Sequence, residues 1–399
     1  MINLKKVAAF GLAAVMSMSL MVGCGSGSSS QSTGGDSASE GAATESTVAT
    51  KHHKIGVGLY TDSGKSVEAI KAYLSGISKT VDCEFVYTTL STYDEATNLT
   101  EVQNLISSGC EGIILTADMG TTAIKDECEA AGVYVAGFLC DYNQSYFTAY
   151  DDVFGSEYFL GTVCDGWADI SAYGEMIADQ VIKNGYKNVG VVIFPEYAYP
   201  NQAACAKVFT EKIEEYNKTA DEKITVKEPT VLNFAPIDAT YFSENADIDC
   251  LFSIAAGASF VYPQMVAAGR TDIALYTSGF EATEDVENFG SSGNGCYKGT
   301  MCSAPEAIAY PLCLLIDKLN GTVYSDLPNP SERVDCQPII ILSDEDMAKV
   351  KDKSMYYSAD YADALITGED IVNMCASYNA DATYAQLVDK LQHLGVEDL

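Results

Sequence analysis

The amino-acid sequence predicts an α/β protein with two lobes, each a parallel β-sheet flanked by helices. From residue 54 onward, short apolar runs alternate with segments of helical periodicity. This alternation occurs twice, and one further strand–helix–strand set follows it. About 345 residues follow the N-terminal region. This is longer than a chain that folds around a single hydrophobic core usually is. These three observations favour two domains over a single large one.

The first half supplies seven elements whose types alternate. The opening run "KIGVGLY" (54–60) is a strand followed by a helix at "SVEAIKAYLSGI" (66–77), because its apolar residues recur at helical spacing. Strands are then expected at 83–90, 112–117 and 133–138, with helices at 98–109 and 121–132. Gly109 and Gly132 end these two helices. Connections this short require a parallel sheet.

The second half repeats the pattern after an irregular Tyr- and Asp-rich stretch, 140–169. Helices are expected at 172–185, 202–217 and 259–269, and strands at 188–194, 223–232, 249–254 and 272–280. A strand and helix at 297–321 and a last strand at 337–342 then suggest that the chain crosses back between the lobes. The expected division is 54–164 with 304–336, and 165–303 with 337–350. A mostly helical tail, 351–399, includes helices at "YADALI" and "TYAQLVDKLQHLG", but the sequence does not place it.

The N-terminus predicts an exported protein. Lys5 and Lys6 precede an apolar run that is short for a bilayer span, which is typical of a signal peptide, here 1–23. Cys24 follows the small residue Gly23, and Met21-Val22-Gly23-Cys24 resembles the lipobox of bacterial lipoproteins; an ordinary signal peptide is the alternative. Ser, Gly and Thr make up 17 of the 26 residues from 25 to 50, so 24–53 is expected to be a flexible linker.

Charge and composition exclude several function classes. A net charge of −33 and only two arginines, Arg270 and Arg333, make nucleic acid and anionic ligands poor partners. Thirteen cysteines lie mostly in apolar segments and are expected to be buried, although Cys296 and Cys302 could form a disulfide. The three histidines show no zinc spacing, and neither a dinucleotide-binding loop nor a nucleophile motif is complete. No catalytic residue, metal or cofactor is therefore expected.

The order of elements resembles that of the type I periplasmic binding proteins, the sugar-type solute receptors of bacterial ABC importers. The resemblance covers about residues 54–350, and rests on "KIGVGLY", "GIILTA…EAAGVYVAGF", "AYGEMIADQVIKNGYKNVGVV" and "TSGFEAT". It implies two Rossmann-like lobes joined by a hinge of several crossings. The family's usual Pro-Phe pair, Arg and Asn-Asp pair are replaced here at 65–67, 199–201 and 255–257. These differences favour a flatter ligand, such as a nucleoside or an aromatic metabolite, beside a sugar.

Open α/β sheets bind ligands in the crevice at the carboxyl ends of their strands. This rule and the resemblance select twelve candidate ligand-binding residues: Tyr60, Thr61, Asp62, Asp118, Asp141, Trp167, Asp169, Tyr197, Tyr199, Phe280, Glu281 and Ser303. Aromatic faces would stack on the ligand, and carboxylates and hydroxyls would orient it.

Several candidates have structural alternatives. Asp62, Asp118 and Asp169 precede helices and could be N-caps. Tyr60 could belong to the core, and Trp167 could pack in the hinge. Tyr197 and Tyr199 could be ordinary surface residues.

The sequence thus predicts a monomeric, extracytoplasmic lipoprotein, held to the membrane by lipid on Cys24, which delivers a small neutral ligand to an ABC permease without catalysis. A ligand-sensing subunit without transport is an alternative that the sequence leaves open. A lipoprotein enzyme is a further one.

Overall fold

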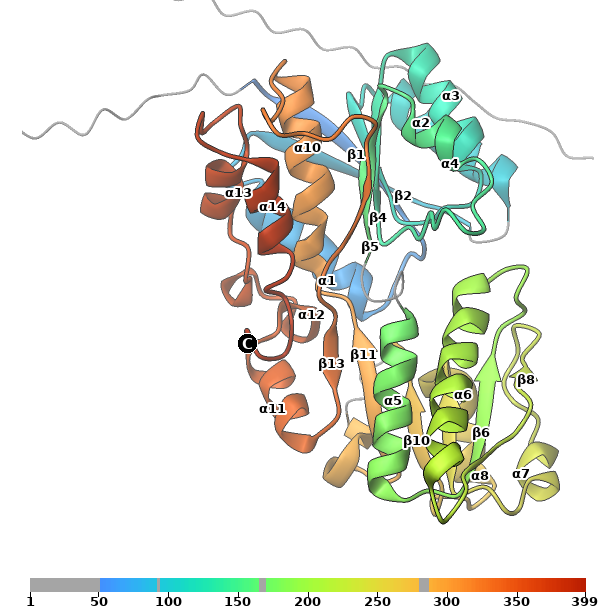
Figure 1. Ribbon diagram of the computed structural model, residues 1–399. Coiled ribbons are helices and arrows are strands. Elements are labelled where there is room, and N and C mark those ends of the chain that lie inside the picture. Colours follow the sequence, from blue (N-terminus) through green and yellow to red (C-terminus); the bar gives the residue numbers. More distant parts are fainter. Residues whose placement is uncertain (1–50, 92–93, 165–169, 280–286) are drawn as a thin grey trace, which may run out of the picture. The chain divides into compact units, whose positions relative to one another are not determined.

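The computed structural model describes residues 51–91, 94–164, 170–279 and 287–399. These residues belong to one compact unit that contains two β-sheets (Figure 1). The predicted fold class, two mostly parallel sheets flanked by helices, is confirmed.

The first sheet has six parallel strands in the order β12-β5-β4-β3-β1-β2. The strands are β1 (His53–Leu59), β2 (Cys83–Thr89), β3 (Gly112–Leu115), β4 (Tyr134–Phe138), β5 (Phe159–Cys164) and β12 (Arg333–Asp335). The helices of this lobe are α1 (Lys65–Ile77), α2 (Glu95–Ser107), α3 (Thr121–Ala131), α4 (Tyr150–Phe154) and α10 (Ala309–Leu319), the last preceded by the 3-10 turn η3 (Pro305–Ile308).

Helices cover both faces of this sheet. On β3, Ile113 and Leu115 pack in the apolar cluster of α2 and α3, whereas Ile114 packs in the cluster of α1 and α10. Successive side chains of a strand point to opposite faces, so a strand covered on both sides is apolar throughout. This explains the continuous apolar run "GIIL".

The second sheet has the order β13-β11-β10-β9-β6-β7, with β8 also pairing with β6. Its strands are β6 (Asn188–Ile193), β7 (Thr225–Val226), β8 (Thr230–Val231), β9 (Cys250–Ser253), β10 (Ala274–Thr277), β11 (Tyr297–Cys302) and β13 (Ile339–Ile341). Its helical segments are α5 (Ile170–Asn184), α6 (Pro200–Thr219), α7 (Thr240–Glu244), the π-helical turn η1 (Gly257–Val261), α8 (Tyr262–Ala267) and the 3-10 turn η2 (Gly290–Ser292).

Two short chain crossings bring the carboxyl ends of the two sheets together. Asp335 ends β12 in the first sheet, and Ile339, which begins β13, pairs with Cys302 at the end of β11 in the second. A chain segment of four residues spans at most about 14 Å. Cys302 is in turn followed within three residues by η3, which leads back to α10. The edge at which the strands of one sheet end therefore lies close to the corresponding edge of the other.

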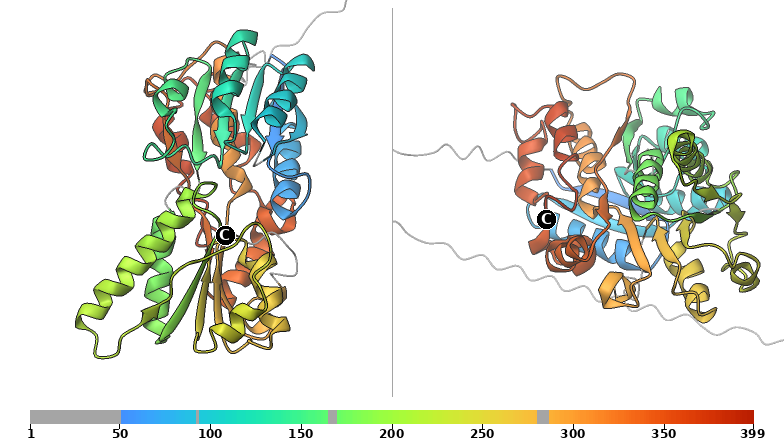
Figure 2. Two further views of the ribbon diagram at one scale, coloured as in Figure 1. Left: turned by 90° about the vertical axis from the view of Figure 1, so that its right-hand side faces the viewer. Right: turned by 60° about the horizontal axis from the view of Figure 1, so that its bottom comes forward.

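The tail joins the first lobe. It contains α12 (Met355–Ser358), the 3-10 turn η4 (Tyr361–Asp363), α13 (Gly368–Met374) and α14 (Tyr384–Lys390). The helix before it, α11 (Asp344–Lys353), contacts the second lobe, where Asp344 accepts a hydrogen bond from the backbone N–H of Ser291 at 3.0 Å. Figures 1 and 2 both show α13 and α14 beside α10. The tail residues Ile371, Leu387 and Leu391 are fully buried in the same apolar cluster as α10. Asp317 of α10 accepts hydrogen bonds from the backbone N–H groups of Ala376 and Ser377, each at 2.8 Å.

The structure corrects several of the expected elements. Residues 140–169 are not irregular throughout, because they contain α4 and β5. One strand expected at 223–232 is divided into β7 and β8, β12 was not expected, and β13 runs antiparallel to β11. "YADALI" forms only the turn η4, and His53, expected in the linker, already belongs to β1.

Candidate functional site

The end of β1 carries the first three candidates. The backbone N–H of Tyr60 donates to Oγ1 of Thr116 at 2.7 Å, which ties the end of β1 to the end of β3. The Tyr60 hydroxyl bonds the Ser66 hydroxyl, and its half-buried ring packs against the core. Thr61 is half-buried and Asp62 is exposed. Asp62 is therefore the most exposed of the three candidates at this strand end.

The two described aspartates that could have been N-caps do not cap their helices. The N-cap residues of α1 and α3 are Gly64 and Gly120, and neither helix has a side-chain cap. Asp62 accepts instead from the Ser63 hydroxyl at 2.8 Å, and the backbone carbonyl of Asp118 accepts from the Thr121 hydroxyl at 2.7 Å. Their carboxylates are thus not used for capping.

Asp118 lies in a distinctive electrostatic environment. Its side chain is solvent-exposed, yet loss of hydration by the surrounding protein raises the pKa of its carboxyl above the ordinary value. This combination suits a ligand-orienting carboxylate.

Asp141, which follows β4, forms an ion pair. Its Oδ1 lies 3.2 Å from Nη2 of Arg333 on β12, and both side chains are largely buried, 13% and 17% exposed. Arg333 also lies 3.5 Å from Asp335. The pairing neutralises much of the negative charge that Asp141 brings to this edge.

In the second lobe an aromatic group forms where β6, β8 and β9 end. Phe194 directly follows β6, and its ring centroid lies 5.2 Å from those of both Tyr199 and Phe234 and 5.9 Å from that of Phe260. Tyr199, Phe234 and Phe260 are half-buried, so parts of their rings face solvent. Tyr199, a predicted residue, thus belongs to this group, whereas Tyr197 is 85% exposed and lies apart from it.

Sequence reasoning missed Phe194, Phe234 and Phe260. The signal was present for Phe194, which is the first residue after a buried strand. Phe234 and Phe260 come from the loop after β8 and from η1, whose positions depend on how the strands are ordered in the sheet. A single sequence does not give that order.

Strained backbone is concentrated at the same two edges. Four non-glycine residues among those described have positive φ, and three of them closely follow strands: Leu139 (60°) after β4, Phe234 (55°) after β8 and Ala256 (32°) after β9. Such conformations cost about 1–3 kcal/mol each and are found preferentially at functional sites. The fourth, Ala359, lies in the tail.

The remaining candidates are divided between described and undescribed residues. Ser303 follows β11 directly, at the crossing back to the first lobe, and is half-buried. Cys24, Trp167, Asp169, Phe280 and Glu281 lie outside the described residues.

The described part of the chain contains no cluster of metal-ligating side chains. Its twelve cysteines are all buried and form no disulfide, so the bridge between Cys296 and Cys302 is absent. No described helix is both long and apolar enough to cross a membrane.

The comparisons with known proteins give the fold. No protein-family model matches the chain, and no curated protein matches it significantly. Among solved structures, an ABC sugar transporter subunit from Rhodobacter sphaeroides has 14% identity and a TM-score of 0.54, with 73% of this chain and 98% of that one covered.

Two further structures contain bound ligands. A periplasmic solute-binding protein of an ABC transporter from Actinobacillus succinogenes, with bound D-allose, has 15% identity and a TM-score of 0.57, covering 74% of this chain and 99% of that one. A solute-binding protein from Agrobacterium vitis, with bound allitol, has 16% identity and a TM-score of 0.56, covering 76% and 100%. This chain has the type I periplasmic binding fold that these proteins share.

Proposed function

We propose that the protein is an extracytoplasmic solute receptor, which captures a small neutral ligand between the carboxyl-end edges of its two sheets and delivers it to an ABC transporter permease. The observation that carries the proposal is the gathering of accessible polar, aromatic and strained residues at both edges. Two short crossings hold these edges close together. In such a fold closure follows when the ligand binds the closed state more tightly than the open one.

The side chains favour a ligand with a flat face and hydroxyl groups. Phe234, Phe260 and Tyr199 offer partly exposed rings for stacking. Asp118 and Thr61 offer acceptors and a donor, and Arg333 offsets the charge of Asp141. A sugar, a polyol or a nucleoside combines these properties. The similar structures with D-allose and allitol support this class.

The N-terminal assignments form part of the proposal. Residues 1–23 are a signal peptide, and lipid on Cys24 with the linker that precedes β1 tethers a monomeric body outside the membrane. The lobes are 54–164 with 304–336, and 165–303 with 337–350. Trp167, Asp169, Phe280 and Glu281 complete the proposed site.

A thermal-shift screen tests the function. The chain from residue 24 onward, carrying Cys24→Ser, is screened against sugars, polyols, nucleosides and, for comparison, amino acids. A ligand at 100 times its Kd stabilises by about 2.7 kcal/mol, which corresponds to a rise of about 4 °C in Tm for a protein of this size. Phe234→Ala is expected to reduce the shift, whereas Tyr158→Ala, at the amino end of β5, leaves it unchanged. A screen in which no sugar, polyol or nucleoside shifts Tm contradicts the proposal.

A further inference from the structure

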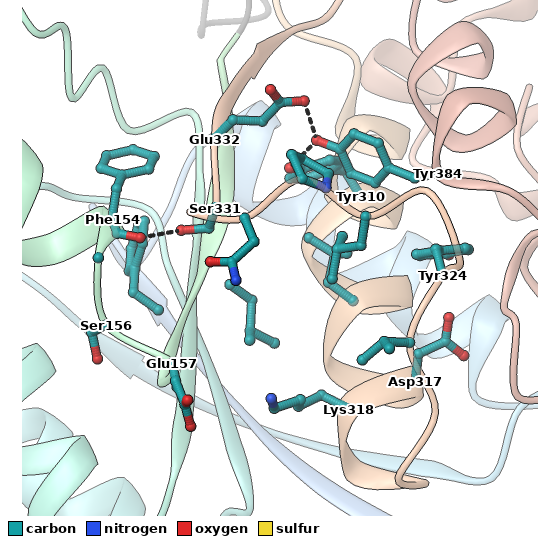
Figure 3. A pocket seen from close by; sticks show the side chains of 18 of the residues that line it. Phe154, Ser156, Glu157, Tyr310, Asp317, Lys318, Tyr324, Ser331, Glu332 and Tyr384 are labelled. Carbon is teal, nitrogen blue, oxygen red and sulfur yellow. Dashed lines mark hydrogen bonds between the residues drawn. The ribbon is translucent and has the colours of Figure 1, made fainter.

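A cavity of about 360 Å³ lies in the first lobe, away from the strand ends described above. Its walls come from one side of α10, the start of β5 with the segment that leads into it, the segment 322–332 that leads into β12, and α14 of the tail (Figure 3). Ligand-binding cavities commonly measure about 300–1,000 Å³. The cavity is therefore large enough for a small organic molecule.

The lining combines apolar and aromatic side chains with polar ones. Leu314 and the rings of Tyr310, Tyr324 and Tyr384 line it from α10, the following loop and the tail, and Phe159 and Leu160 line it from β5. All three tyrosine rings are buried. These elements fix one another, because the Tyr324 hydroxyl donates to the backbone carbonyl of Met374 at 2.8 Å. The cavity walls are thus held in place by contacts between the tail and the lobe.

A chain of hydrogen bonds ends at a carboxylate in one wall. The Tyr384 hydroxyl donates to Oε1 of Glu332 at 2.7 Å, and so accepts at 2.9 Å from the Tyr310 hydroxyl. Burial raises the pKa of both tyrosines above their ordinary value, so both hydroxyls keep their protons. Among the described residues, none donates a hydrogen bond to Oε2 of Glu332. The half-buried carboxylate has one oxygen available to a ligand.

The balance of charge around the cavity is negative. Figure 3 shows Glu332 at one end and Glu157 with Lys318 at the other. The Lys318 ammonium lies 5.3 Å from the ring centroid of Tyr134, a residue outside the lining. This cation–π contact holds the positive charge of Lys318 on Tyr134. With a net charge of −33 over the whole chain, the surroundings further favour a cation.

We propose that this cavity is a second ligand-binding site, which takes a small amphipathic cation: an apolar ring carrying one amine. The ring would contact the tyrosine and leucine side chains, and the ammonium would bind the available oxygen of Glu332. This site is independent of the proposed crevice function, since none of its lining residues belongs to the candidate set at the strand ends.

Titration calorimetry with phenethylamine tests the site. Phenethylamine is expected to bind with a Kd of about 1 mM or lower, within the range for a ligand of its size. Two probes of the same shape serve as comparisons: 2-phenylethanol, which is neutral, and 3-phenylpropionate, which is an anion. The anion should bind at least about tenfold more weakly than the amine, because it meets Glu332 with like charge. Absence of measurable heat with phenethylamine, or equal affinity for the anion, overturns the proposal.

The variant Glu332→Gln separates the carboxylate from the apolar walls. It still accepts the Tyr384 hydrogen bond, but should weaken phenethylamine about tenfold and leave 2-phenylethanol nearly unchanged. Glu228→Gln, an exposed position in the second lobe, is the matched control and should change neither. Hydrogen exchange on the unsubstituted chain locates the bound amine without any variant. Slower exchange in 154–160 and 322–332 is expected, and slowing only after β1, β3 or β6 overturns the proposal.

Discussion

Asp118 combines solvent exposure with a raised pKa. Burial by the surrounding protein raises the pKa of its carboxyl above the ordinary value, although the residue reaches solvent. The folded protein therefore disfavours the ionised carboxylate. In the proposed function this carboxylate orients the ligand, and perturbed carboxylates occur often at such sites.

We predict that Asp118→Asn weakens binding of the crevice ligand about tenfold and does not lower Tm. The substitution removes a charge-assisted hydrogen bond to the ligand, and it also removes a carboxylate that the fold disfavours. Titration calorimetry and thermal unfolding of the variant measure the two effects. Asp221→Asn, at an exposed loop position, is the control. Lower stability together with unchanged ligand affinity would give Asp118 a structural role instead.

The buried carboxyl of Glu306 is expected to make the stability of the protein depend on pH. It lies in η3, is 2% exposed, and accepts a hydrogen bond from the backbone N–H of Leu365 at 3.2 Å. Burial raises its pKa from 4.5 to about 7. The folded state therefore binds more protons than the unfolded state between these values, so stability contributed by this group falls as pH rises through that window.

Glu306→Gln should consequently raise Tm at pH 8, where the wild-type carboxylate is ionised and buried. The expected gain is at most about 3 kcal/mol, at about 1.4 kcal/mol for each pKa unit. At pH 4.5 the two proteins should unfold at nearly the same temperature, because the wild-type side chain is then neutral. Thermal unfolding at both pH values measures this, and an equal gain at both would show that the carboxylate titrates normally.

At the scale of elements, the tail is part of the first lobe's core and not an appendage. Leu387 in α14 is fully buried, and both α13 and α14 begin with capping boxes at Thr367 and Thr383. Such caps fix where a short helix begins. The helices then pack against α10 through buried side chains from both partners.

Leu387→Ala should lower the free energy of unfolding by about 2–5 kcal/mol, because it leaves a cavity in this shared core. Denaturant unfolding with ligand absent measures the loss. Val266→Ala, which truncates an exposed aliphatic side chain on α8, should cost less than about 0.5 kcal/mol. A loss of similar size at both positions would mean that α14 packs only loosely on the lobe.

Sequence patterns predicted the elements well where local signals were strong. β3 and β4 are uninterrupted apolar runs, β1 is apolar from Ile55 onward, and α3 ends at the predicted Gly132 in left-handed conformation. β5 was missed because the polar, Tyr-rich context before it hides a six-residue strand. β12 has only three residues, one of them an arginine, and its position depends on pairing with β5 and not on its own periodicity.

The same limit applies to the candidate site. Tyr60, Thr61 and Asp118 could be chosen because each directly follows a recognisable strand. The ion pair between Asp141 and Arg333 could not be predicted. The two residues are 192 positions apart in the sequence and meet only after β12 has joined the sheet. The placement of the tail depended in the same way on long-range packing.

The whole molecule is organised around one feature: two mostly parallel sheets whose strand ends are brought together by short crossings. A single sheet would place its ligand-contacting residues on one side of the ligand only. The chain passes from Asp335, at the end of β12 in the first sheet, to Ile339, which pairs with Cys302 at the end of β11 in the second. We therefore expect residues of both lobes to contact one ligand.

Hydrogen exchange followed by mass spectrometry, with and without the best ligand from the thermal-shift screen, tests this claim most directly. We predict that the ligand slows exchange after β1 and β3 in the first lobe and after β6 and β8 in the second, all at the same ligand concentration. Slowing confined to one lobe, or no slowing at any of these strand ends, would contradict it.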